Sequence, residues 1–342
     1  MTIRLRTAFF IFLAFFAAWF LYIERAILTP FILGIIFAYI FNPVINFFYR
    51  YIKLPRTLSI VIIYLTIVSL FIFLGVTLTR QVTNESSEFK SFINKLPETT
   101  EMQVDNLPSW IKPVAQDTLS FLEKPKSISS TSVFNFFPQA ITSIIGFFIF
   151  LFSGFYFLRD GKNMFNKLLS LAPGTYRGDL DYLSLRINNV LRGYLRGQVF
   201  MVFLVSVVLY IALSIVGVKF ALILAIFSGL VEIVPIIGPI FAGAVGALIA
   251  LTSSNLSFGL NSLQGAVVVI VVYFVVRQIQ DYFVAPGVMG RIVKLHPLVI
   301  LFSVLAGQHI WGIMGVILAV PIAGVIRILL EFSMEKINKS KK

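Results

Sequence analysis

Glu232 is the residue of this sequence whose type and surroundings most strongly suggest transport chemistry. It is the only charged residue between Lys219 and Arg277. A charge at the centre of a bilayer costs roughly 2.5 to 3.5 kcal/mol on insertion scales, so such a residue faces protein or water and often marks a pathway. Helix-breaking residues follow it at Pro235, Gly238 and Pro239. Because each proline interrupts helical hydrogen bonding and frees carbonyl groups for a solute or cation, we expect a gate or binding element here, with Glu232 carrying a proton or a cation. A structural cap or ion pair at a helix end is the alternative.

A second polar segment lies near the C-terminus, at Gln308 and His309. The Gln308 amide can donate and accept hydrogen bonds, and His309 could titrate near neutral pH. We expect these side chains to form a second pathway element, with a hydrogen-bonded packing role for His309 as the alternative.

A third polar group ends a long apolar run, at Arg277, Gln278, Gln280 and Asp281. Helical spacing places Arg277, Gln280 and Asp281 on one face, where they could line a pathway; an Arg277–Asp281 pair that only anchors the helix end is equally compatible. The sequence contains no HExxH, GxSxG, GxxxxGK[ST] or GxGxxG motif, and its two histidines and lack of cysteine argue against a catalytic zinc site. We therefore predict no enzyme, no metal site and no cofactor, with coupling to H⁺ or Na⁺ as the one ionic requirement left open.

The composition places the elements that carry these residues in a lipid bilayer. Of 342 residues, 58% are hydrophobic and 13% are charged, whereas soluble domains carry roughly 25% charged residues. The net charge of +13 is explained by basic residues on the cytoplasmic side of a membrane, so we do not expect nucleic acid as a partner.

Charge-free runs of spanning length divide the chain. The expected segments are three transmembrane helices in 1–79, an extracytoplasmic polar helical element in 80–132, a fourth transmembrane helix in 133–158, a cytoplasmic amphipathic segment in 159–196, a transport core in 197–326 and a basic cytoplasmic tail in 327–342. The first run, 7–23, is expected to be a retained signal anchor rather than a cleaved signal peptide. In the amphipathic segment, apolar residues from Leu180 to Tyr194 form a seam that fits either the membrane surface or a subunit contact.

Two charge-free segments, 220–252 and 295–326, are too long for single spans. As one helix, 220–252 would extend about 50 Å, against a hydrocarbon core of about 30 Å. We expect both to be re-entrant helical hairpins, which gives an all-α integral membrane protein with about six full transmembrane helices and eight hydrophobic segments in total. The loops 1–6, 50–56, 159–196, 277–294 and 327–342 would then all face the cytoplasm with a summed net charge of +14. If both segments crossed the membrane instead, the basic loop 277–294 would face outward, against the positive-inside tendency.

A weak internal repeat supports this topology. Phe227-Ser228-Gly229-Leu230 precedes a Gly238 segment, much as Phe302-Ser303-Val304-Leu305 precedes a Gly315 segment. The two repeats are the span 197–218 with hairpin 220–252 and the span 260–276 with hairpin 295–326. The proposed topology inverts them relative to each other, which is typical of transporters whose broken helices meet around a substrate site.

The sequence resembles the autoinducer-2 exporter (AI-2E) family of PerM-like permeases over nearly its whole length. The resemblance rests on PFILGIIFAYIFNP (30–43), FYFLRD (155–160), LRGYLRGQ (191–198), EIVPIIG (232–238) and the stretch that begins QDYFVAPGVMGRIVKLHP at residue 280. It implies a homo-oligomeric permease, with a pentamer as the candidate assembly, and autoinducer-2 export in some members but sodium or lithium/proton antiport in others. Substrate does not transfer with the fold.

From residues and resemblance together, we expect a permease of the inner (plasma) membrane with cytoplasmic termini. It would export a small polar metabolite, autoinducer-2 or similar, along a pathway lined by the two hairpin tips. Sodium (lithium)/proton antiport through Glu232 and a non-transporting membrane scaffold are the alternatives. Structural or gating roles are expected for Pro30, Pro43, Arg192, Gly193, Arg196, Gly197, Pro286, Gly290, Gly307, Gly312, Gly315 and Pro321.

Overall fold

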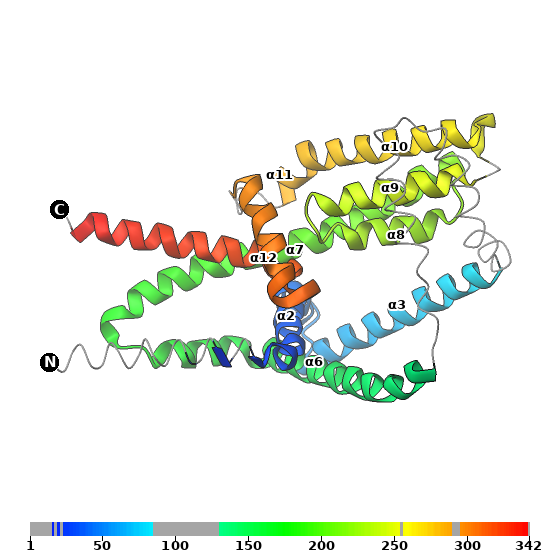
Figure 1. The fold of residues 1–342 in the computed structure, drawn as a ribbon. Coiled ribbons are helices and arrows are strands. Elements are labelled where there is room, and N and C mark those ends of the chain that lie inside the picture. The colour runs from blue at the N-terminus through cyan, green and yellow to red at the C-terminus, as the bar shows by residue number, and fades with distance from the viewer. Residues whose placement is uncertain are drawn as a thin grey trace. The chain divides into compact units, whose positions relative to one another are not determined.

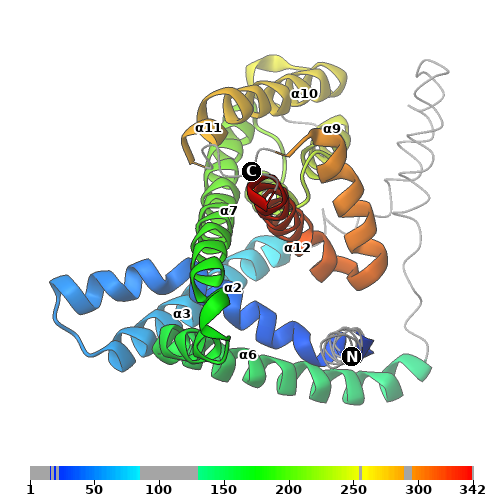
Figure 2. The same ribbon diagram turned by 90° about the vertical axis from the view of Figure 1, so that its left-hand side faces the viewer.

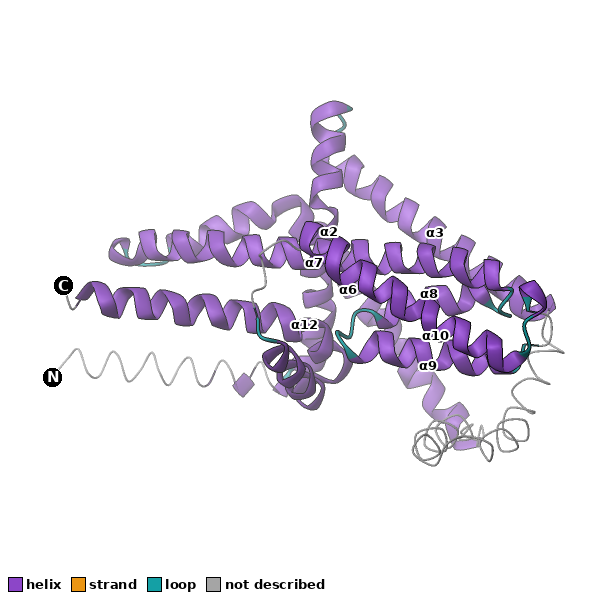
Figure 3. Cartoon of the chain, turned by 90° about the horizontal axis from the view of Figure 1, so that it is seen from above, coloured by secondary structure: helices purple, strands orange, loops and turns teal. Residues whose placement is uncertain are grey.

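The computed structural model describes residues 16, 19, 20, 23–84, 130–253, 256–288 and 295–340, all of its regular elements being helical (Figures 1 and 3). The elements are α2 (Arg25–Tyr51), α3 (Arg56–Asn84), α6 (Ser130–Ser170), α7 (Gly174–Val216), α8 (Ala221–Val231), α9 (Ile237–Leu251), a 3-10 turn (Ser257–Gly259), α10 (Ser262–Ile279), a π-helical turn (Gln280–Val284), α11 (Ala285–Val288) and α12 (Pro297–Ser340). Most of the predicted first span, most of the element 80–132 and Gly290 lie outside the described residues.

Six of the described helices contain stretches long and apolar enough to cross a membrane. These stretches are Arg25–Tyr51, Arg56–Thr77, Ser143–Ser170, Tyr176–Val216, Ser262–Val288 and Pro297–Asn338. The first five overlap the spans predicted after residue 25, and the sixth overlaps the predicted hairpin 295–326. In the described residues the predicted all-helical fold is confirmed, and these six apolar helices indicate a multi-pass membrane protein.

The chain divides into two compact units. One comprises 1–63, 139–199 and 287–342, and the other comprises 64–138 and 200–286. Helices α3 and α7 each contribute to both.

In the second unit, α8, α9 and α10 lie side by side (Figures 1 and 3). At 1.5 Å per residue, α8 is about 16 Å long and α9 about 22 Å, so neither crosses a core of about 30 Å alone. Small residues permit the close packing: a Cβ at Gly229 of α8 would lie 2.6 Å from the carbonyl oxygen of Val202 in α7, and one at Gly246 of α9 would lie 2.9 Å from the ring of Tyr273 in α10. The core consists of buried aliphatic residues, among them Leu209, Leu213, Leu224 and Val269.

In the first unit, α12 is broken at Trp311 and Gly312, and Figure 2 shows its first arm turning back into the second. Gly312 has φ 58 and ψ −138, a conformation open essentially to glycine alone. The arms touch through backbone, because a Cβ at Gly315 would lie 1.8 Å from the carbonyl oxygen of Gly307. The breaks in α8–α9 and in α12 fall inside the two segments predicted as hairpins. That each segment enters and leaves the bilayer on the same side stays a prediction.

The amphipathic stretch 159–196 continues two long helices instead of forming one of its own. Helix α6 runs through Arg159 to Ser170, and α7 runs without a break from Gly174 through Gly197 to Val216. Part of the apolar seam is covered by α12: Tyr194 packs with Val320, and Val190 lies 3.1 Å from the Cβ position of Gly324.

Candidate functional site

The Glu232 side chain lies in the break between α8 and α9 and is buried, with 7% of its surface exposed. Its Oε1 atom accepts a hydrogen bond from Arg277 Nη1 at 3.0 Å and another from Gln280 Nε2 at 2.6 Å. Arg277 in turn donates from Nε to Asp281 Oδ2 at 2.8 Å. The structure thus brings Glu232 together with the polar end of α10, all within one compact unit.

Gln280 marks a local change in the helix that presents these groups. Helix α10 ends at Ile279, and Gln280 to Val284 form a π-helical turn. Such turns widen a helix by one residue and frequently occur at functional sites. Here the turn begins at the buried Gln280, the residue that donates to Glu232.

Ile236 holds the break in a strained conformation. Its φ of 69° and ψ of −58° belong to a γ-turn, and the backbone N–H of Ile237 donates to the Pro235 carbonyl oxygen at 2.8 Å, which closes that turn. This form is rare, and a β-branched residue at positive φ costs of the order of 1–3 kcal/mol. The strain lies four residues from Glu232, where surrounding packing must maintain it.

A small cavity adjoins Glu232. Its volume is about 20 Å³, enough for roughly one water molecule or one small ion and far too small for a sugar-sized metabolite. Its lining includes both aliphatic and polar side chains, and consists of Val205, Leu209, Ser228, Glu232, Pro239, Ala242, Tyr273, Val276, Arg277 and Gln280.

Ser228 and Tyr273 add two hydroxyl groups that the sequence did not single out. The Ser228 Oγ donates to the Leu224 carbonyl oxygen at 2.6 Å and lies 2.7 Å from the Tyr273 hydroxyl. Ser228 stands four residues before Glu232 and Tyr273 four residues before Arg277, so each shares a helix face with a charged residue. That spacing is the signal by which they could have been found.

Electrostatically, the group consists of two carboxylates, on Glu232 and Asp281, and one guanidinium, on Arg277. One excess negative charge remains, which a proton or a monovalent cation would neutralise. Within the described part of the chain, no cluster of three or more His, Cys, Asp or Glu residues could hold a metal ion.

The other predicted pathway residues take different positions. Pro239 lines the cavity, whereas Pro235, Gly238 and Gln278 do not. Gly238 instead packs against backbone: a Cβ there would lie 2.0 Å from the Val231 carbonyl oxygen.

Gln308 and His309 lie in the other unit, next to the break in α12, and are exposed. This tip is held by α2: Trp311 Nε1 donates to Thr29 Oγ1 at 3.2 Å, and Arg25 Nη1 donates to the Ile310 carbonyl oxygen.

Two of the predicted structural residues, Pro43 and Arg196, meet at one hydrogen bond. Proline at position 43 lacks an N–H, so the carbonyl of Tyr39, four residues earlier in α2, has no helical donor. Arg196 Nε of α7 donates to this carbonyl at 3.0 Å. Gly197 and Pro321 are buried, Gly193 is half-buried and Arg192 is exposed.

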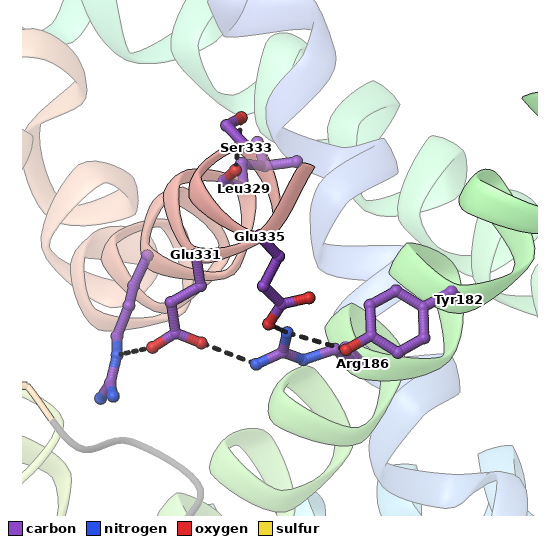
Figure 4. Close-up of polar contacts among 7 residues, drawn as sticks. Tyr182, Arg186, Leu329, Glu331, Ser333 and Glu335 are labelled. Carbon is purple, nitrogen blue, oxygen red and sulfur yellow. Dashed lines mark hydrogen bonds and ion pairs between the residues drawn. The ribbon is translucent and has the colours of Figure 1, made fainter. Parts of the chain in front are cut away.

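A charged cluster joins the first part of α7 to the last turns of α12 (Figure 4). Arg186 contacts Glu331 at 2.6 Å and Glu335 at 3.6 Å. Lys336 pairs with Asp179. Glu331 also accepts a hydrogen bond from Arg327 Nε at 2.7 Å. Since these side chains are about one third to one half exposed, each pair contributes roughly 0–1 kcal/mol.

Comparisons with known proteins agree on one family. Residues 9–335 match the family described as AI-2E family transporter. A provisionally named transport protein of Bacillus subtilis (strain 168), YueF, is 30% identical over 314 residues, covering 87% of this chain and 82% of that protein. The sodium-lithium/proton antiporter of Halobacillus andaensis is 23% identical over 312 residues, covering 85% of each chain.

Proposed function

The chain belongs to the AI-2E transporter family, and on that premise we propose that it is a permease of the inner (plasma) membrane that exports a small polar metabolite, autoinducer-2 or a similar compound. The pathway runs past the break between α8 and α9. The observation that carries this proposal is the buried Glu232, hydrogen-bonded to Arg277 and Gln280 where two short helices meet. A structural protein gains little from an ionised group in this position, because burying an ion pair costs desolvation energy that apolar packing does not.

The cavity beside Glu232 requires a conformational change for such a solute. At about 20 Å³ it admits one water molecule, so a metabolite would pass only after α8 and α9 separate at their tip. The strained γ-turn at Ile236 supplies a place where two backbone arrangements can be close in energy.

Sodium (lithium)/proton antiport is the second candidate function, and the same cavity favours it. A volume of about one water molecule, together with one excess negative charge, suits a single monovalent cation or a proton. The relative from Halobacillus andaensis is named for this activity. Antiport requires a titratable group in the pathway, and Glu232 supplies one.

Flux in proteoliposomes tests both candidates. We would compare autoinducer-2 movement, and the pH change on sodium addition, for the native chain, Glu232→Gln and Glu335→Gln. The last variant neutralises an exposed carboxylate in the other unit and serves as the matched control. We expect autoinducer-2 flux in the native chain and the control, and a loss of about tenfold or more in Glu232→Gln, from removal of a buried charge-assisted hydrogen bond.

Each outcome decides between the functions. Sodium-driven proton release without autoinducer-2 movement would replace export by antiport. Neither signal, with normal folding and assembly, would reject both and leave the scaffold hypothesis. An equal loss of flux in Glu335→Gln would show that the effect is not specific to Glu232, and would reject the placement of Glu232 in the pathway.

A further inference from the structure

We propose that the cavity beside Glu232 is a site for one monovalent cation, Na⁺ or Li⁺, and that Arg277 is its built-in competitor. The proposal rests on the transport function proposed above and adds how the site is filled when no cation is present. In this structure the Arg277 guanidinium is paired with the Glu232 carboxylate. A cation that binds to Glu232 displaces the guanidinium toward Asp281.

The lining of the cavity supplies oxygen ligands suited to a hard cation. Around it stand a carboxylate at Glu232, hydroxyl groups at Ser228 and Tyr273, and a carboxamide at Gln280. Carboxylate, carbonyl and hydroxyl oxygens are the ligands that hard cations prefer. The Gln280 nitrogen donates to Glu232, so its oxygen is the atom left for a cation.

The charge of the group favours a cation with a single positive charge, and the volume limits how much water that ion can keep. The three charged groups sum to one negative charge, which Na⁺ or Li⁺ cancels and which Ca²⁺ would overcompensate. An uncompensated charge in a desolvated site is costly. The volume of about 20 Å³ holds an ion with little or no water.

Arg277 can leave Glu232 without losing its own partner. Its Nη1 atom contacts Glu232 at 3.0 Å, while its Nε atom contacts Asp281 at 2.8 Å, one helical turn further along. The Asp281 side chain is 45% exposed and that of Glu232 only 7%. The Arg277 guanidinium would therefore move from a buried carboxylate to one that contacts solvent. In both arrangements each charged side chain keeps an opposite charge beside it, which makes exchange feasible in a buried site.

Competition by a tethered cation has a direct consequence for binding. The free energy of the Arg277–Glu232 contact must be given up each time a cation binds. Removing the guanidinium therefore raises cation affinity, whereas removing the carboxylate that receives it lowers affinity. A residue that only anchors the helix end would change affinity in neither direction.

Binding of radioactive Na⁺ to the purified full-length protein in detergent tests this without transport. We expect Arg277→Gln to lower the dissociation constant at least about fivefold, Asp281→Asn to raise it by a similar factor, and Glu232→Gln to abolish binding. Arg159→Gln is the matched control, because Arg159 forms an exposed pair with Asp160 at 2.9 Å in the other unit. Unlabelled Li⁺ should compete with Na⁺, and Ca²⁺ and choline should not.

Weaker or unchanged binding in Arg277→Gln would overturn the proposal, as would stronger competition by Ca²⁺ than by Li⁺. If Arg277→Gln fails to fold, Asp281→Asn decides, and native affinity in that variant rejects the exchange. Absence of Na⁺ binding alongside autoinducer-2 flux would reject this inference and leave the export function standing. Na⁺ binding without any flux would support this inference and reject the export function.

Discussion

Near Glu232, position 238 has no room for a side chain. A Cβ at this position would lie 2.0 Å from the backbone carbonyl oxygen of Val231, which cannot rotate away. We expect Gly238→Ala to lower stability by about 1–3 kcal/mol, as overpacking does, and to reduce flux by distorting the α8–α9 break that positions Glu232. Thermal unfolding in detergent measures the first effect and proteoliposome flux the second.

Gly243→Ala is the matched control in the same helix. Its Cβ would meet Tyr273 at 3.5 Å, an ordinary contact, and alanine is favoured over glycine within a helix by about 0.4–1 kcal/mol. Equal stability of the two variants would contradict the steric explanation for Gly238.

Among the individual residues of the candidate site, the sequence identified the charged side chains but not the hydroxyl groups. Glu232 and Arg277 were visible because charges are rare in apolar runs and costly there. Ser228 and Tyr273 were not, because hydroxyl residues are common in such helices and gain meaning only when α8 and α10 are known to be neighbours. The prediction that Gln308 and His309 line a pathway stays untested, and both are exposed in this structure.

Among the elements, α2 and α7 are joined by a hydrogen bond that a proline makes necessary. Replacing Arg196 by Met leaves the Tyr39 carbonyl without its donor, since Pro43 has no N–H to offer. We expect a loss of about 1 kcal/mol, because that acceptor is only partly buried. In a Pro43→Ala background the helix supplies its own N–H, so the same Arg196→Met change should cost less.

A double-mutant cycle measured by thermal unfolding gives the coupling between these two positions, expected at about 0.5–3 kcal/mol. Pro30→Ala is the control background, because Pro30 interrupts a different turn of α2. Additive effects of Arg196→Met and Pro43→Ala would show that the contact does not depend on the missing N–H.

The sequence predicted the positions of the helix breaks more accurately than the positions of the helix ends. Length and proline content predicted half-helices in 220–252 and 295–326, and the breaks occur at 232–236 and at Trp311–Gly312. Hydropathy did not show that α6 and α7 extend beyond their apolar parts, because it measures preference for lipid and not for helix. Lys, Arg and Leu are strong helix formers, so the basic stretch after residue 159 continues α6 up to the turn at 171–173.

For the whole molecule, the sequence predicted which segments are apolar but not which ones pack together. The predicted repeat assigns α10 to the second hairpin, whereas α10 contacts α9 and belongs to the same compact unit as the first. Helix association in lipid depends on small residues such as Gly246, whose Cβ would lie 2.9 Å from the Tyr273 ring, rather than on hydropathy. An inverted relation between the two hairpin segments stays a prediction.

The orientation of these segments in the membrane can be decided by labelling, since the chain contains no cysteine. We expect Ser257→Cys to react with a membrane-impermeant thiol reagent only from outside the cell, and Gly287→Cys only from the cytoplasmic side. The reason is charge: 253–259 contains no Lys or Arg, whereas 277–294 carries a net charge of +2. Position 287 has open space around its Cβ, so the substitution itself is tolerated.

Asn338→Cys is the reference, because the basic tail is cytoplasmic in either topology. The opposite pattern at 257 and 287 would mean that 220–252 and 295–326 each cross the membrane completely, and the pathway would then have to be rebuilt from full spans.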